Sequence, residues 1–198
     1  MKKNNFQGAD AQGVFPPVPS INFHLWKPCN MRCKFCFATF DDFPAGYLPK
    51  GHLPEDEAIS LVEEIGKSGF QKITFAGGEP LLCPWLDKLL SKAKQMGMTT
   101  MIVTNGYKLT QEWLTKNAHN IDWITLSIDS LVDQTNKDSG RAHIGKTVLN
   151  ATEQKIRAIM IKEAGIRFKI NTVVHRLNMG EDMNSFILSV KPERWKLF

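Results

Sequence analysis

The chain has 198 residues, of which 42% are hydrophobic and 23% charged, with a formal net charge of +5. These proportions are typical of a globular domain and exclude a disordered or fibrous chain. No apolar run reaches the roughly 18 residues of a membrane span, and no apolar stretch follows the early lysines as in a secretory signal. We therefore expect a cytoplasmic protein without membrane contact. Its mild positive charge suits an anionic ligand and does not indicate a nucleic acid polymer as partner.

Residues 1–19 are polar and rich in proline, and we expect a flexible arm without a core of its own. From residue 20 onward, short strand-like runs alternate with helical stretches. The predicted strands are Ile21–Leu25, Lys72–Phe75, Thr99–Val103, Trp123–Ile128, Arg167–Val174 and Arg194–Phe198. The predicted helices are Pro54–Ser68, Trp85–Met96, Gln111–Asn117, Lys146–Ala164 and Glu181–Val190. This alternation predicts an α/β fold with right-handed crossovers and a parallel sheet, formed by a single domain over residues 20–198.

Apolar and polar side chains alternate along most of these strands, so each strand should present one apolar and one polar face. We expect helices to cover the apolar face; in the helix Lys146–Ala164, Ile156, Ile159 and Met160 should point toward it. The polar face should carry four cations, Lys72, Lys169, Arg194 and Lys196, with Asp129 as the only acid beside them. A desolvated cation without a counter-charge is costly, so these residues favour a bound polyanion or an interior open to water.

Three of the four cysteines fall within eight residues, at Cys29, Cys33 and Cys36, directly after the first predicted strand. In a chain without an export signal, this clustering favours metal binding over disulfides. An iron–sulfur cubane normally takes four cysteines, so three would leave one iron with an open position for chemistry. The alternatives are a zinc site completed by His24 or His52, or three unrelated core cysteines. Zinc sites usually have a second cysteine pair, which is absent here.

The cysteine loop, with Phe35 before its last cysteine, resembles the signature of the radical S-adenosylmethionine (SAM) superfamily. Gly77-Gly78-Glu79-Pro80, after the second predicted strand, resembles the GGEP motif of the same superfamily. The resemblance implies a partial (βα)6 radical SAM barrel that holds a [4Fe-4S] cluster on Cys29, Cys33 and Cys36 and binds SAM. The residues that it assigns to SAM are Gly77, Gly78, Glu79, Asn105, Ser127, Asp129 and Arg141.

Four further stretches, Ile21–His24, Phe168–Val174, Glu181–Met183 and Arg194–Lys196, are similar to the viperins, a family within this superfamily. The resemblance covers residues 20–198. It implies a radical SAM lyase that dehydrates a nucleoside triphosphate to its 3′-deoxy-3′,4′-didehydro analogue through a 5′-deoxyadenosyl radical, in antiviral defence. An external electron donor of the flavodoxin or ferredoxin type is also implied. The residues that the resemblance assigns to the triphosphate substrate are Lys72, Lys169, Asn171, Arg194, Lys196 and His24.

Two parts of the viperin family have no counterpart in these 198 residues: the membrane-anchoring amino-terminal helix of the animal proteins and the carboxyl-terminal portion that closes over the nucleotide. We therefore expect a soluble, prokaryotic-type relative that is truncated at its C-terminus. Such a chain should bind the cluster and SAM and be impaired in catalysis.

Other functions remain as alternatives. One is a radical SAM enzyme that acts on a protein or another small molecule, and a second is a non-catalytic zinc-binding or P-loop module. The stretch Gly140–Thr147 satisfies the phosphate-loop pattern G-x4-G-K-T. That pattern requires a buried strand before its first glycine, whereas residues 133–139 are polar and turn-like. Cys83 lies in an apolar context and should be part of the core.

Overall fold

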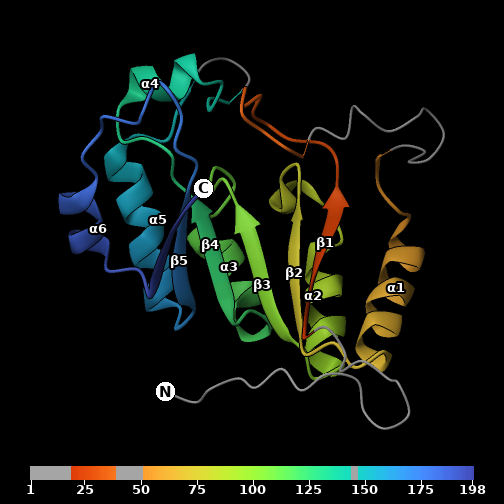
Figure 1. Ribbon diagram of the computed structural model, residues 1–198. Coiled ribbons are helices and arrows are strands. Elements are labelled where there is room, and N and C mark those ends of the chain that lie inside the picture. Colours follow the sequence, from red (N-terminus) through yellow and green to blue (C-terminus); the bar gives the residue numbers. More distant parts are fainter. Residues whose placement is uncertain (1–18, 39–50, 144–146) are drawn as a thin grey trace, which may run out of the picture.

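The computed structural model describes residues 19–38, 51–143 and 147–198, so the arm predicted over residues 1–19 lies almost entirely outside the described residues. One six-stranded sheet forms the centre, and its strands follow one another in chain order (Figure 1). The strands are β1 (Ser20–Trp26), β2 (Lys72–Gly77), β3 (Thr99–Thr104), β4 (Trp123–Ser127), β5 (Arg167–Thr172) and β6 (Arg194–Leu197). Every neighbouring pair is parallel, as predicted. All six strands therefore end at the same edge of the sheet.

The helices alternate with the strands. They are α1 (Glu55–Lys67), α2 (Leu86–Gln95), α3 (Gln111–Asn117), α4 (Asp133–Asp138), α5 (Ala151–Glu163) and α6 (Asn184–Val190), with short 3-10 turns η2 (Pro80–Leu82) and η3 (Ala118–Asn120). None of these helices is both long and apolar enough to cross a bilayer. The α/β class and the partial barrel arrangement predicted from the sequence are confirmed.

The hydrophobic core lies between one face of the sheet and the helices. Phe75 on β2 and Phe168 on β5 are almost completely buried there, together with Val62 of α1 and Leu89 of α2. These strand residues alternate with the predicted polar positions, so the predicted facing of the strands is correct. We call the opposite face of the sheet, which carries Thr125 and the predicted cations, the polar face.

The helix predicted over Lys146–Ala164 is shorter than predicted, and a different set of its side chains faces the core. It begins at Ala151 because Asn150 and Glu153 form a capping box, in which each side chain accepts a hydrogen bond from the other's backbone N–H. Of the side chains predicted to face inward, Ile156 and Ile159 are 48% and 42% exposed, whereas Met160 does pack against the core. The buried positions are Gln154, Ala158 and Ile161.

Two further boundaries differ from the prediction. The stretch predicted to be turn-like contains the short helix α4. The helix predicted from Glu181 begins instead at Asn184. The Glu181 carboxylate is engaged elsewhere: it accepts hydrogen bonds from Ser130 Oγ and from the backbone N–H of Leu131, both at 2.6 Å. Glu181 therefore connects the segment before α6 to the loop after β4.

Candidate functional site

A cavity of about 300 Å³ opens at the carboxyl ends of the strands. All three clustered cysteines line it, as do all seven residues predicted to contact SAM, together with His24 and Asn171. Lys72, Lys169, Arg194 and Lys196 do not line this cavity and belong to the adjoining polar face. The fold thus brings together residues that are separated by more than 140 positions in the sequence.

The cysteine loop is held against three other segments. The backbone N–H groups of Arg32 and Lys34 donate to the carbonyls of Gly140 and Ser139, at 3.1 and 2.9 Å. On another side, the side-chain amide of Asn105 donates to Asn30 Oδ1 at 2.8 Å. Phe35 adds a third anchor, because its ring stacks on that of His175 with centroids 4.8 Å apart. These contacts fix the loop without using the thiols.

The thiols themselves remain free of disulfides, and Cys29 and Cys33 are partly buried whereas Cys36 is exposed. Burial raises the pKa of the Cys29 and Cys33 thiols above the ordinary value, and for Cys33 the nearby Arg141 guanidinium opposes this effect. The donor set consists of three sulfur atoms on one short loop beside an open cavity. This set fits a [4Fe-4S] cluster with one iron free to bind a further ligand.

The zinc alternative receives no support from the histidines. His52 stacks on Trp26 with ring centroids 4.5 Å apart, makes an edge contact with Trp85, and does not line the cavity. His24 lines the cavity, where burial lowers its pKa. Across residues 19–38, 51–143 and 147–198, no three His, Cys, Asp or Glu side chains are grouped around a position for a single metal ion.

The phosphate-loop alternative is also not supported. Gly140 follows helix α4 and not a buried strand, and its carbonyl binds the cysteine loop. Gly145 and Lys146 of the pattern lie outside the described residues. Cys83 is 6% exposed and belongs to the core, as predicted, and burial raises its pKa to about 11.

The Gly77-Gly78-Glu79 stretch lies directly against the start of the cysteine loop. A β-carbon on Gly78 would lie 2.2 Å from the Lys27 carbonyl oxygen, so only glycine fits there. The Glu79 side chain is buried and accepts hydrogen bonds from Thr104 Oγ1 at 2.6 Å and from the backbone N–H of Asn105 at 2.8 Å. Glu79 thereby ties the end of β2 to the end of β3 and positions the Asn105 backbone beside the cavity.

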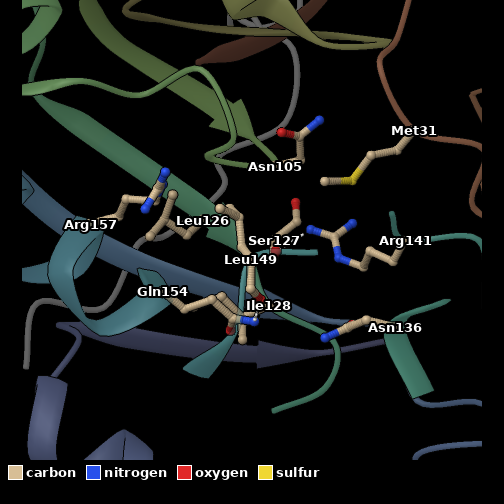
Figure 2. Close-up of a pocket in the computed structure, with 10 residues that line it drawn as sticks. All are labelled: Met31, Asn105, Leu126, Ser127, Ile128, Asn136, Arg141, Leu149, Gln154 and Arg157. Atoms are coloured by element: carbon tan, nitrogen blue, oxygen red, sulfur yellow. Dashed lines mark hydrogen bonds between the residues drawn. The ribbon is translucent and has the colours of Figure 1, made fainter. Parts of the chain in front are cut away.

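Arg141 and Asp129 form a buried ion pair at the wall of the cavity, with Arg141 Nε 2.8 Å from Asp129 Oδ2. Figure 2 shows the Arg141 side chain directed toward Ser127, whose backbone carbonyl it binds. Asp129 lies just beyond β4 and lines the cavity together with Ser127, as the alternation predicts. It is not a counter-charge for the cations of the polar face, because it forms its ion pair with Arg141.

The predicted cations of the polar face lie close to one another. In the register of the sheet Lys169 pairs with Arg194, and Asn171 pairs with Lys196. The pKa of Lys169 is lowered by burial and by the charges of Lys196, Arg194 and Lys72. None of these four cations takes part in an ion pair with a residue that the structure describes.

A fifth cation, Arg167, was not found from the sequence. It precedes Lys169 by two positions on β5 and therefore shares its face, and its guanidinium lies 4.4 Å from the centroid of the Trp123 ring. Together with burial and Arg194, its charge lowers the pKa of Lys72. Extending the strand alternation by one step would have found it. The polar face thus carries a cluster of five cations, of which Lys72, Arg167 and Arg194 are the first residues of their strands.

A model of the radical SAM superfamily matches residues 26–187 of the chain. A protein of Lacinutrix mariniflava named S-adenosylmethionine-dependent nucleotide dehydratase is 57% identical over 180 residues, covering 91% of this chain and 38% of that protein. A protein of the same name from Flammeovirga pacifica is 53% identical over 185 residues, covering 91% of this chain and 62% of that protein. The chain therefore spans less than two thirds of the length of either relative.

Among solved structures, anSMEcpe with bound AdoMet and the Kp18Cys peptide superimposes with a TM-score of 0.70. The two chains are 16% identical, and the match covers 90% of this chain and 50% of that one. At this identity the likeness shows a common fold.

Proposed function

The chain belongs to the radical SAM superfamily, and we propose that it binds a nucleoside triphosphate on its polar face and removes water from the ribose, giving the 3′-deoxy-3′,4′-didehydro nucleotide. The two relatives named as nucleotide dehydratases support this reaction. The observation that carries the proposal is a cluster of cations on the same face of the sheet as the cavity, in which Lys196 pairs with the cavity-lining Asn171.

In this proposal Cys29, Cys33 and Cys36 hold the [4Fe-4S] cluster, and SAM occupies the adjoining cavity. Once bound and reduced, such a cluster would supply, together with SAM, a 5′-deoxyadenosyl radical for removal of the hydrogen atom at C4′ of the ribose. The remaining task of the protein is to orient the substrate and keep water away. The cavity is suited to this task because its lining is mainly apolar, with contributions from Met31, Phe35 and Val173.

Lys72, Lys169, Arg194 and Lys196 are proposed to hold the triphosphate. A triphosphate has roughly four negative charges near neutral pH, and hydrogen bonds between charged partners are the stronger kind. Asn171 lines the cavity and pairs in the sheet with Lys196, so it lies where the cation cluster meets the cavity. A nucleotide bound by its phosphates at the cations would therefore place its ribose toward the cysteine loop.

His24 is proposed to contact the nucleotide from the opposite edge of the sheet, on β1. Its ring makes an edge contact with Phe37, with centroids 6.0 Å apart, and burial lowers its pKa, which favours the neutral imidazole. We further propose that an external flavodoxin- or ferredoxin-like protein supplies two electrons, one for the cleavage of SAM and one for the substrate after its 3′-hydroxyl leaves as water. The product would block chain elongation by a viral polymerase, which is the proposed role in antiviral defence.

The test is to reconstitute the protein with iron and sulfide without oxygen, reduce it, and incubate it with SAM and each of the four ribonucleoside triphosphates. We expect 5′-deoxyadenosine and a nucleotide lighter than its substrate by one water, both detected by mass spectrometry. If 5′-deoxyadenosine forms at the same rate with or without any triphosphate, the proposed substrate is wrong while the superfamily assignment is unaffected.

A further inference from the structure

The Arg141 guanidinium makes three separate contacts at the wall of the cavity. Its Nε lies 2.8 Å from Asp129 Oδ2, and one terminal nitrogen lies 3.8 Å from Cys33 Sγ. The other terminal nitrogen donates to the Ser127 carbonyl, as Figure 2 shows. The side chain is only 10% exposed. Arg141 therefore has one donor directed at a sulfur atom that is proposed to ligate iron.

Asp129 is more deeply buried than Arg141 and is held by hydrogen bonds to both its side chain and its backbone. Its side chain is 3% exposed, and its Oδ1 accepts a hydrogen bond from the Val173 backbone N–H at 2.7 Å. Its backbone carbonyl accepts a further hydrogen bond from the Asn178 side chain at 2.7 Å. The carboxylate is thus fixed by the loop after β5 on one side and by Arg141 on the other.

We propose that Asp129 is a positioning residue, which holds the Arg141 guanidinium against Cys33 so that an N–H group of Arg141 acts on the sulfur and makes the cluster easier to reduce. Hydrogen bonds to the sulfur ligands and nearby charge are among the factors that set the reduction potential of an iron–sulfur cluster. A fixed positive charge favours the reduced cluster, which carries one more negative charge. The inference depends on the cluster and not on the nucleotide substrate.

This role is compatible with the expected contact between Arg141 and SAM. A guanidinium has five N–H groups, and the three contacts in the structure use one each. Two N–H groups are left for a carboxylate. Asp129 contributes to both roles only through Arg141, which distinguishes it from a residue that touches SAM itself.

The experiment replaces Asp129 by asparagine. In D129N the remaining amide oxygen still accepts from Val173, but the NH2 group now faces the Arg141 Nε–H, so two donors oppose each other and the ion pair is lost. D122N is the matched control. Asp122 stands just before β4, at its other end, where it pairs with Lys94 at 3.0 Å and accepts a hydrogen bond from the Thr100 backbone at 2.8 Å.

The measurement is an EPR-monitored redox titration of the reconstituted proteins without SAM, with iron and sulfide contents determined in parallel. Loss of the Asp129 charge alone would make the midpoint potential more positive, because Asp129 lies close enough to affect Cys33. We expect D129N nevertheless to shift the potential to a more negative value, because the Arg141 N–H group is no longer held against the sulfur, whereas D122N keeps the wild-type potential although it also loses stability. A D129N protein that holds a full cluster at the wild-type potential overturns the proposal, because a merely structural residue would behave in that way.

R141K provides the second variant, for the case in which D129N does not load iron. Lysine keeps the charge, but its single ammonium group cannot reach Asp129, Cys33 and Ser127 at once. We expect R141K to fold and to shift the potential in the same negative direction. A wild-type potential in R141K overturns the proposal whatever the outcome for D129N.

Discussion

Gly140 and Arg32 lie in direct backbone contact, although 108 positions separate them: the Arg32 N–H donates to the Gly140 carbonyl at 3.1 Å. A β-carbon on Gly140 would lie 2.0 Å from the Arg32 carbonyl oxygen, and the backbone has a positive φ of 78°. The cysteine loop therefore rests on a position that only glycine can occupy.

We predict that G140A impairs cluster assembly more than it impairs folding, because the loop must move to admit the methyl group. G165A is the matched control. Gly165 has a similar φ of 73°, but its β-carbon would meet nothing within 4 Å. Both variants should lose about 1–2 kcal/mol from the positive φ, as measured by urea denaturation. Only G140A should bind less iron on reconstitution, and equal iron contents in the two variants would contradict the prediction.

Much of this site could be predicted from local patterns. The cysteine spacing and the Gly77–Pro80 motif are contiguous in the sequence, and parallel strands necessarily end at one edge. Alternation along β5 correctly placed Phe168 in the core and Lys169 opposite it. These features depend on near neighbours in the chain, so a single sequence is enough to indicate them.

The sequence predictions fail for residues whose contacts are made with partners that lie far away in the sequence. Asp129 faces the interior as predicted, but its ion pair with Arg141, twelve positions later in the sequence, was not found. Gln154 is polar and was not expected inside, yet it is buried because its amide donates to the carbonyls of Leu149 and Ser130. Ile156 is displaced to the surface as a result of this orientation.

Glu79 provides a pH test of the contact between β2 and β3. Burial raises the pKa of its carboxyl group, against the opposing effect of hydrogen bonds from Thr104, Asn105 and Leu81. A raised folded-state pKa means that the folded protein binds a proton more tightly than the unfolded chain does. This contribution to stability is fully present below the ordinary glutamate pKa and is lost as the pH rises through the raised value.

The free energy of unfolding of the wild type should therefore contain a component that falls with rising pH above the ordinary glutamate range. E79Q should lack that component, because a glutamine cannot titrate. Urea denaturation at a series of pH values measures the difference between the two proteins. Parallel pH profiles for wild type and E79Q would show that the Glu79 pKa is not raised. E57Q, at an exposed position on α1, is the control for the loss of one surface carboxylate.

Arg167 provides a test of the extent of the cation cluster. Its guanidinium lies over Trp123 and shares a strand face with Lys169. We predict that R167Q weakens binding of tripolyphosphate or ATP by a few-fold and makes the affinity less sensitive to salt, because one of the attracting charges is removed. Isothermal titration calorimetry at two salt concentrations measures both effects. K155Q changes an exposed cation on α5, on the helix-covered side of the sheet, and should change neither.

The charge of Lys169 should lower the stability of the folded protein and strengthen the binding of an anion. Burial and the charges of Lys196, Arg194 and Lys72 lower its pKa, so its charge is unfavourable in the folded protein without an anion. Between the lowered and the ordinary pKa the unfolded chain binds more protons, and stability rises with pH in that window.

We therefore predict that K169M, which keeps the apolar stem but removes the charge, is at least as stable as the wild type near neutral pH. Its advantage should shrink as the pH approaches the ordinary lysine pKa, because the wild-type lysine then loses its charge.

Since a hydrogen bond to a charged group contributes about 1.5–3 kcal/mol, K169M should bind ATP roughly 10- to 100-fold more weakly, while its iron content stays unchanged. K67M is the control: Lys67 is exposed on α1 and pairs with Glu63 at 2.6 Å, so its loss should leave ATP binding intact. If K169M is destabilised and binds ATP as tightly as the wild type, Lys169 does not belong to an anion site.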